Sequence, residues 1–203
     1  MKHPKLDLWP SESIDRWSES LTRYESIVAQ QGVEGLAELD RWWRAELPAA
    51  ISGRARPHIT HDELVRVTRW KMARGVWRAR NLVLVQGNAP ATVMDVSRAA
   101  LAGVPDPKAP VATLVRLAGV GPATASAVLA AAAPEVYPFF DELVAAEVPT
   151  LEKVAYTLSY YFRYAAALRE RSRQLGGEWT PSKVEQALWS HAGGKAGARR
   201  AGK

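Results

Sequence analysis

Two glycines and a proline lie close together between two apolar segments in the middle of the chain. The segment 113–129 reads TLVRLAGVGPATASAVL, in which Gly119 and Gly121 precede Pro122. Proline is favoured in the first turn of a helix, and glycine adopts backbone conformations that a tight turn needs. We therefore predict two helices joined by a hairpin turn over Ala112–Ala133.

Such a turn provides the chemistry of an anion site. The first N–H groups of a helix have no partner within it, and the positive end of the helix dipole lies behind them. Phosphate groups bind at such N-termini. A hairpin that only packs is the alternative, but the length of the pattern favours nucleic acid. The predicted nucleic-acid contacts of the turn are Gly119, Val120, Gly121, Ala123 and Thr124. Val120 is expected to tuck inward, and arginine at either glycine to weaken binding without unfolding the protein.

Two neighbouring carboxylates follow the hairpin after a proline-containing segment. The segment 137–142 reads YPFFDE, so that Asp141 and Glu142 stand where the next helix is expected to start. A carboxylate can stabilise a cation that develops on a sugar. Aspartate is also a favoured N-cap in any helix. Asp141 is the candidate catalytic residue, with capping as an equal alternative and Glu142 as the competing carboxylate.

A basic run interleaved with tryptophans lies at 70–80, which reads WKMARGVWRAR. Cations in such a run can contact phosphates, and we predict that Lys71, Arg74 and Arg78 do so. The two tryptophans could stack on a base. Because exposed aromatic side chains are uncommon, we favour the protein core for both Trp70 and Trp77. Lys71 also offers an amine nucleophile outside the hairpin.

The hairpin and the aspartate that follows it resemble the helix-hairpin-helix (HhH-GPD) base-excision DNA glycosylase superfamily. This superfamily includes the endonuclease III, 8-oxoguanine and alkyl-base glycosylases. The resemblance is carried by Thr113–Val144, and more loosely by the helical layout of Thr60–Leu175. The run at 70–80, with Asn81 and Asn88, is similar to uncharacterised, cysteine-free proteins that carry this hairpin. The resemblance implies an all-α fold of two helical lobes with a cleft between them.

The resemblance also implies an activity, namely hydrolysis of the N-glycosidic bond of a damaged or modified base flipped from duplex DNA. Bifunctional members carry a lysine on the second hairpin helix, where this chain has Ala123, so we expect a monofunctional enzyme without a lyase step. No cofactor is expected, except a sodium or potassium ion on the backbone carbonyls of Val115, Leu117 and Val120. A non-catalytic DNA-binding protein and an enzyme acting on RNA or nucleotides are the rival interpretations.

The elements that position these residues are expected to be helical throughout, because apolar residues recur at spacings of three and four. Thr60 and Glu63 have the spacing of a capping box, which marks a helix start. We expect residues 1–192 to form one helical domain and residues 193–203 a basic, disordered tail. The predicted helices outside the hairpin cover residues 14–28, 36–47, 60–74, 81–86, 91–101, 141–148, 150–175 and 180–190.

Composition excludes several classes of protein. The chain of 203 residues is long enough for a buried core. It has no cysteine, which excludes disulfides, cysteine-bound zinc and iron–sulfur clusters. Apolar runs are too short for a membrane span, and the N-terminus does not read as a secretion signal. We therefore expect a cytoplasmic protein that binds no membrane. The resemblance implies a nucleoid-associated monomer that binds duplex DNA.

Net charge supports that partner only weakly. The formal charge is +6, but four of the basic residues lie in the predicted tail: Lys195, Arg199, Arg200 and Lys203. A basic protein attracts polyanions only where its charges gather on one surface. His58 and His61 have the spacing of a metal pair on a helical turn, but a structural or surface role is the better interpretation, because no carboxylate cluster accompanies them.

Overall fold

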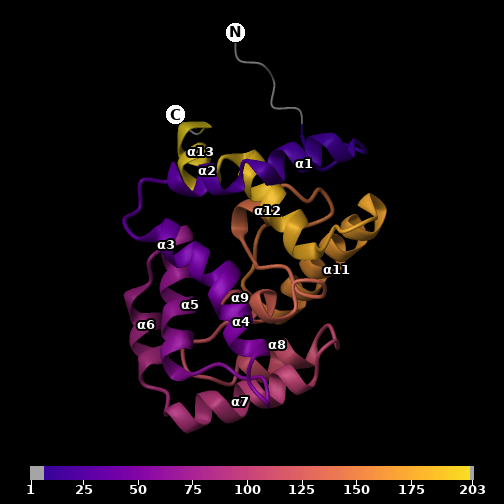
Figure 1. The fold of residues 1–203 in the computed structure, drawn as a ribbon. Coiled ribbons are helices and arrows are strands. Elements are labelled where there is room, and N and C mark those ends of the chain that lie inside the picture. The colour runs from indigo at the N-terminus through magenta and orange to yellow at the C-terminus, as the bar shows by residue number, and fades with distance from the viewer. Residues whose placement is uncertain (1–6, 202–203) are drawn as a thin grey trace.

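The computed structural model describes residues 7–201, with side chains through residue 197, and within this range the chain forms helices and no β-strand (Figure 1). Its α-helices are α1 (Ile14–Thr22), α2 (Tyr24–Ala29), α3 (Leu36–Arg41), α4 (Leu47–Ser52), α5 (His61–Arg74), α6 (Ala79–Gln86), α7 (Pro90–Ala102), α8 (Ala109–Leu114), α9 (Pro122–Ala132), α10 (Glu142–Ala146), α11 (Leu158–Leu175), α12 (Pro181–Ala192) and α13 (Gly194–Ala201). A π-helical segment, η1 (Trp42–Glu46), joins α3 to α4. The predicted all-α fold class is confirmed for these residues.

Two helices organise the packing. Helix α12 contacts α1, α2, α10, α11 and α13, whereas α9 contacts α4, α5 and α8. In Figure 1, α1, α2 and α13 gather at one end of the molecule, and α7 and α8 lie at the other. Every residue from Ala123 to Ala131 of α9 is buried. Most of them are small, so neighbouring elements approach the α9 backbone closely on all sides.

Local signals fix several helix ends as predicted. At the start of α5, the Thr60 hydroxyl accepts the Glu63 N–H at 3.2 Å, and the Glu63 carboxylate accepts the Thr60 N–H at 2.8 Å. The predicted helix over residues 150–175 instead begins at Leu158. Its start is set by Thr157, whose side chain accepts the N–H of Tyr160 at 3.2 Å. The predicted helix over residues 14–28 is divided into α1 and α2 at Arg23.

The expectation of a disordered tail is wrong for residues 194–201, which form α13. Gly193 ends α12 in the left-handed conformation, with φ of +78°. Gln31 then anchors the new helix, because its side-chain carbonyl accepts the N–H of Ala196 at 2.9 Å. Among the basic tail residues, only Lys195 has a described side chain; those of Arg199 and Arg200, and all of Lys203, lie outside the described residues.

None of the helices in the described part of the chain is both long and apolar enough to cross a membrane.

Candidate active site

The turn between α8 and α9 uses its two glycines for different purposes. Gly119 has φ of +74°, and a Cβ atom there would lie 2.6 Å from the carbonyl oxygen of Asn81 and 2.9 Å from Cβ of Leu84. Gly121 has φ of −98°, and a Cβ atom there would meet nothing within 4 Å. Gly119 therefore lets α6 pack on the turn, whereas Gly121 faces open space. The expectation that arginine is tolerated at either glycine is wrong for Gly119.

The backbone amides of the turn divide into used and free groups. The N–H of Thr124 donates to the carbonyl of Gly121 at 3.0 Å, and Val120 is buried as predicted. The N–H groups of Gly119, Gly121 and Ala123 donate to no other residue that the structure describes. Gly121 and Ala123 line a pocket beside the turn, so their amides are offered to an external acceptor, whereas the Thr124 side chain is buried.

Asn88 holds the turn in place from the end of α6. Its amide nitrogen donates to the carbonyl of Ala118 at 2.9 Å, and its amide oxygen accepts the N–H of the same residue at 2.9 Å. The amide nitrogen also donates to the carbonyl of Val85 at 2.9 Å. A side chain that both donates to and accepts from one backbone unit fixes the position of that unit strongly.

Asp141 lies at the N-terminus of α10, where its carboxylate accepts the N–H of Leu143 at 2.8 Å. The capping role is therefore present, and the residue is only 6% exposed. Neighbouring helices position it: the Phe140 N–H donates to the hydroxyl of Ser126 on α9 at 3.0 Å. The hydroxyl of Tyr164 on α11 donates to the backbone carbonyl of Phe139 at 2.7 Å. The carboxylate is thus held on a rigid support.

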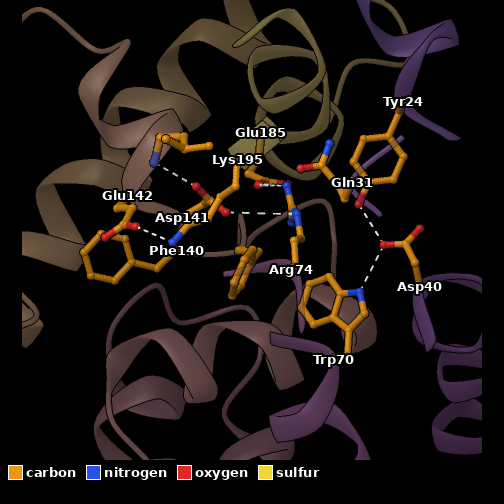
Figure 2. A network of polar contacts seen from close by, with 12 residues as sticks. Tyr24, Gln31, Asp40, Trp70, Arg74, Phe140, Asp141, Glu142, Glu185 and Lys195 are labelled. Atoms are coloured by element: carbon orange, nitrogen blue, oxygen red, sulfur yellow. Dashed lines mark hydrogen bonds and ion pairs between the residues drawn. The ribbon is translucent and has the colours of Figure 1, made fainter. Parts of the chain in front are cut away.

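Arg74 lies beside Asp141 (Figure 2) and is buried. Its Nη2 atom lies 2.6 Å from Oε1 of Glu185, and its Nε atom lies 4.0 Å from Oδ2 of Asp141. Aromatic rings surround the guanidinium, with the centroid of Trp189 at 4.4 Å and that of Phe139 at 5.0 Å. The prediction that Arg74 contacts a phosphate is wrong, because the side chain is buried and lies against the carboxylates of Glu185 and Asp141.

Burial in this cluster disfavours the ionised form of both carboxyl groups. Burial raises the pKa of Asp141, and the guanidinium of Arg74 opposes that rise. Burial likewise raises the pKa of Glu185 to about 8, again against the effect of Arg74. For Arg74, burial alone would lower the pKa, but Glu185, Tyr24 and Asp141 together more than offset this, so the guanidinium stays charged. Two carboxyl groups therefore share one cation.

The two tryptophans of the basic run have different environments. Trp70 is buried as predicted, its ring stacked on Trp43 at a centroid distance of 3.9 Å and its Nε1 atom donating to Asp40 at 3.0 Å. The prediction that Trp77 lies in the core is wrong, since it is 59% exposed. Helix α5 ends at Arg74, so the helical spacing that relates the two tryptophans stops before Trp77.

Two adjoining pockets form a cleft that leads from Asp141 to the α8–α9 turn. They share Lys71, Arg78, Ala123 and Tyr156 in their walls. The pocket at the Asp141 end also includes Phe139 and Phe140. The cleft brings together six of the predicted site residues: Lys71, Arg78, Gly121, Ala123, Thr124 and Asp141. Gly119, Val120 and Arg74 line neither pocket.

Three further residues complete the rim of the cleft. The Glu142 carboxylate lies 2.8 Å from Nζ of Lys195 and accepts the Tyr156 hydroxyl at 2.8 Å. The hydrogen bond from Lys195 lowers the pKa of Glu142. Glu142 is therefore held as a rim ion pair, and Asp141 is the carboxylate that lies deeper. Sequence reasoning missed Lys195, assigned to a disordered tail, and Tyr156, assigned to a helix.

Lys71 has an unusual position for a lysine. It is half-buried in the last turn of α5, in the walls of both pockets. No carboxylate of the described residues lies within ion-pair distance of its amine. Burial lowers the pKa of Lys71, and the positive charge of Arg78 lowers it further. The cleft thus holds a half-buried amine that has no salt bridge among the described residues and whose pKa is lowered.

Among the described residues, no group of three or more histidine, aspartate or glutamate side chains could hold a metal ion. His61 contacts the carbonyl of Gln86 at 3.1 Å, and His58 contacts that of Arg56 at 2.8 Å. Their side chains are thus engaged with backbone at the surface.

Comparisons with known proteins give no relative for this chain: no family model, curated protein or solved structure matches it. The geometry of the cleft therefore carries the functional conclusion.

Proposed function

We propose that this protein is a DNA glycosylase-like enzyme that hydrolyses the N-glycosidic bond of a damaged or modified base flipped out of duplex DNA. The observation that carries the proposal is the position of Asp141. Its carboxylate is held in place by the Leu143 N–H and lies in a cleft whose other end is the α8–α9 turn. One groove thus joins a group that can stabilise a sugar cation to a group of amides that can bind phosphate.

In this proposal, α8, the turn and α9 form a helix-hairpin-helix that grips the DNA backbone, within two helical lobes on either side of the cleft. The free amides of Gly119, Gly121 and Ala123 are the phosphate donors. Gly121 permits a phosphate to approach the backbone closely, because it has no side chain and no atom lies within 4 Å of where its Cβ would be. Lys71 and Arg78 supply positive charge along the same groove. The resemblance of the sequence to the helix-hairpin-helix glycosylase superfamily supports this proposal.

Asp141 would act on the bond between base and sugar. As that bond breaks, positive charge develops on the deoxyribose, and a carboxylate beside it lowers the energy of this state. Water then attacks C1′, and the base leaves with the electron pair of the broken bond. Burial raises the energy of the ionised Asp141 carboxylate in the free protein. An approaching cation relieves that cost, which makes the interaction stronger in the transition state than in the ground state.

In this proposal, carbonyl groups of the turn hold a sodium or potassium ion. The carbonyl oxygens of Val115 and Val120 accept no hydrogen bond from the described residues outside helices, and that of Leu117 accepts only the N–H of Val120. Hard cations prefer such oxygen ligands. A monovalent ion there would add positive charge beneath a bound phosphate.

A base-release assay tests the proposal. Duplexes with alkylated, oxidised or deaminated bases are incubated with the protein and then heated in alkali, which breaks the strand at abasic sites. Asp141→Asn is a well-matched variant, because asparagine caps a helix as well as aspartate does but carries no charge. We expect release by the wild type and a loss of about 100-fold or more in this variant. Glu142→Gln is the comparison, and a larger loss there would move the role to Glu142.

A non-catalytic DNA-binding protein is the second candidate, favoured by the low exposure of Asp141, which is 6%. Such a protein would bind duplex DNA with strong salt dependence, since each phosphate contact releases counterions, yet release no base from any duplex. An enzyme acting on RNA or nucleotides would show no preference for duplex DNA and no dependence on its length.

A further inference from the structure

Trp77 lies on the surface in the segment between α5 and α6, and base hydrolysis gives it no role. Single exposed apolar side chains are common, but a cluster of them marks a contact surface. Trp77 belongs to such a cluster, because the exposed residues Val33 and Val76 line the same depression. We call this depression the Trp77 hollow.

The Trp77 hollow has a volume of about 600 Å³, within the range of roughly 300–1,000 Å³ that is usual for small-molecule sites. It adjoins the pocket that contains Asp141, because the two share four residues in their walls: Gly75, Val76, Glu142 and Lys195. A strand bound in the cleft can therefore extend along the surface into the hollow.

The charged groups around the hollow already have partners. Nζ of Lys195 lies 2.8 Å from the Glu142 carboxylate, and the buried guanidinium of Arg74 lies 2.6 Å from the carboxylate of Glu185. The side-chain amide of Gln31 is bonded to backbone groups. Neither cation of the hollow is thus left for a phosphate, whereas a flat, uncharged ring can pack on the exposed indole.

Trp77 and Arg78 are consecutive in the chain but line different spaces. Arg78 lines both pockets of the cleft, whereas Trp77 lines the hollow. A DNA strand likewise alternates phosphates with bases, so a strand whose phosphate lies at Arg78 brings a neighbouring base toward Trp77. Bases of any identity stack on aromatic side chains.

We propose that the Trp77 hollow binds the unpaired nucleobase next to the target nucleotide, stacked on the indole of Trp77. This inference rests on the proposed function, which places the target nucleotide at Asp141. A paired base has both faces covered by its neighbours, so the adjacent base must leave the stack as well. Unstacking costs least where a base is mismatched or already unpaired. The preferred substrate is therefore a duplex with two successive unpaired nucleotides, as in a bulge.

Fluorescence anisotropy of the full-length protein tests this preference with two labelled duplexes of the same target strand, one fully paired and one with a two-nucleotide bulge. We expect the bulged duplex to bind at least about 10-fold more tightly. Trp77→Ser should weaken binding of the bulged duplex by about 5- to 100-fold and that of the paired duplex by less than about twofold. Trp77→Phe keeps a ring and should retain part of the preference.

Val83→Ser is the matched control for the loss of an exposed apolar side chain. Val83 lies on α6, is exposed and does not line the hollow. This variant should therefore bind both duplexes like the wild type.

Photo-crosslinking locates the base in the wild-type protein, so this measurement does not depend on the folding of a variant. Iododeoxyuridine replaces each bulged nucleotide in turn, and ultraviolet light joins it to an aromatic side chain on which it stacks. We expect one of the two positions to give an adduct that peptide mapping by mass spectrometry places on Trp77.

The outcomes separate this inference from the proposed function. Equal affinity for the two duplexes, or an adduct that maps to another aromatic residue such as Tyr156, overturns the role of the hollow and leaves base hydrolysis standing. Trp77-dependent binding of the bulge by a protein that releases no base supports the hollow and refutes the glycosylase. Failure to bind either duplex refutes both.

Discussion

Alanine at Gly119 and alanine at Gly121 should have opposite effects on stability, although the two glycines are separated by one residue. At Gly119, alanine must adopt φ of +74°, and its Cβ would lie 2.6 Å from the Asn81 oxygen and 2.9 Å from the Val85 nitrogen. The left-handed conformation costs an L-residue about 1–2 kcal/mol. Displacing the packed backbone of α6 adds roughly 1–3 kcal/mol. We therefore expect Gly119→Ala to lower the free energy of unfolding by about 2–5 kcal/mol.

At Gly121, the same substitution meets no atom within 4 Å, and φ of −98° suits any residue. Reduced freedom of the unfolded chain should then stabilise the protein by about 0.4–1 kcal/mol. Thermal unfolding followed by circular dichroism measures both variants, since 1 kcal/mol shifts the midpoint by roughly 2–4 °C in a protein of this size. Equal shifts for the two variants would refute the assignment of Gly119 to packing and Gly121 to open space. Gly121→Arg should not lower the midpoint and should weaken duplex binding.

Three further predictions concern the buried charges and the exposed tryptophan. Arg74→Met should destabilise the protein by about 3–5 kcal/mol in urea unfolding, because it leaves two buried carboxyl groups without a cation. Adding Glu185→Leu to this variant should recover part of the lost stability. The folded-state pKa values of Asp141 and Glu185 lie above those of the unfolded chain, the latter at about 8. The folded state thus holds protons that the unfolded state releases, so the free energy of unfolding should fall as the pH increases from about 4.5 to about 8. A free energy of unfolding that increases over this pH range would contradict the pKa shifts. Trp77→Ser should change stability by less than about 0.5 kcal/mol, since the side chain is 59% exposed, and a large loss would show that it packs in solution.

Local rules of sequence predicted much of the helical layout. The capping box of Thr60, the proline at the start of α9 and the aspartate before α10 each act through neighbouring residues, so their signals are complete within a few positions. The end of α12 at Gly193 follows the same logic, but α13 depends on Gln31, which lies far away in the sequence. No local pattern reports such an anchor, and a small, basic tail therefore looked disordered.

The basic run at 70–80 shows why the site was only partly predictable. Lys71, Arg74 and Arg78 are all cationic and lie three or four positions apart. Arg74 nevertheless lies inside the molecule, whereas Lys71 and Arg78 lie in the cleft. The partner that draws Arg74 inward is Glu185, separated from it by 111 positions. A long cationic side chain can snorkel to the surface or pair internally, and only the tertiary fold decides between these.

The separation of charge within the cleft favours a substrate that is negatively charged at one end and develops positive charge at the other. At the first end, Asp141 is the carboxylate that opens on the cleft, and the buried Glu185 shares the cation Arg74 with it. Lys71, Arg78 and the free amides of Gly121 and Ala123 form the positive end. A phosphate would be repelled from the first end and attracted to the second, whereas a developing cation would experience the reverse. A nucleotide held by its phosphate, with its sugar directed toward Asp141, meets both conditions at once.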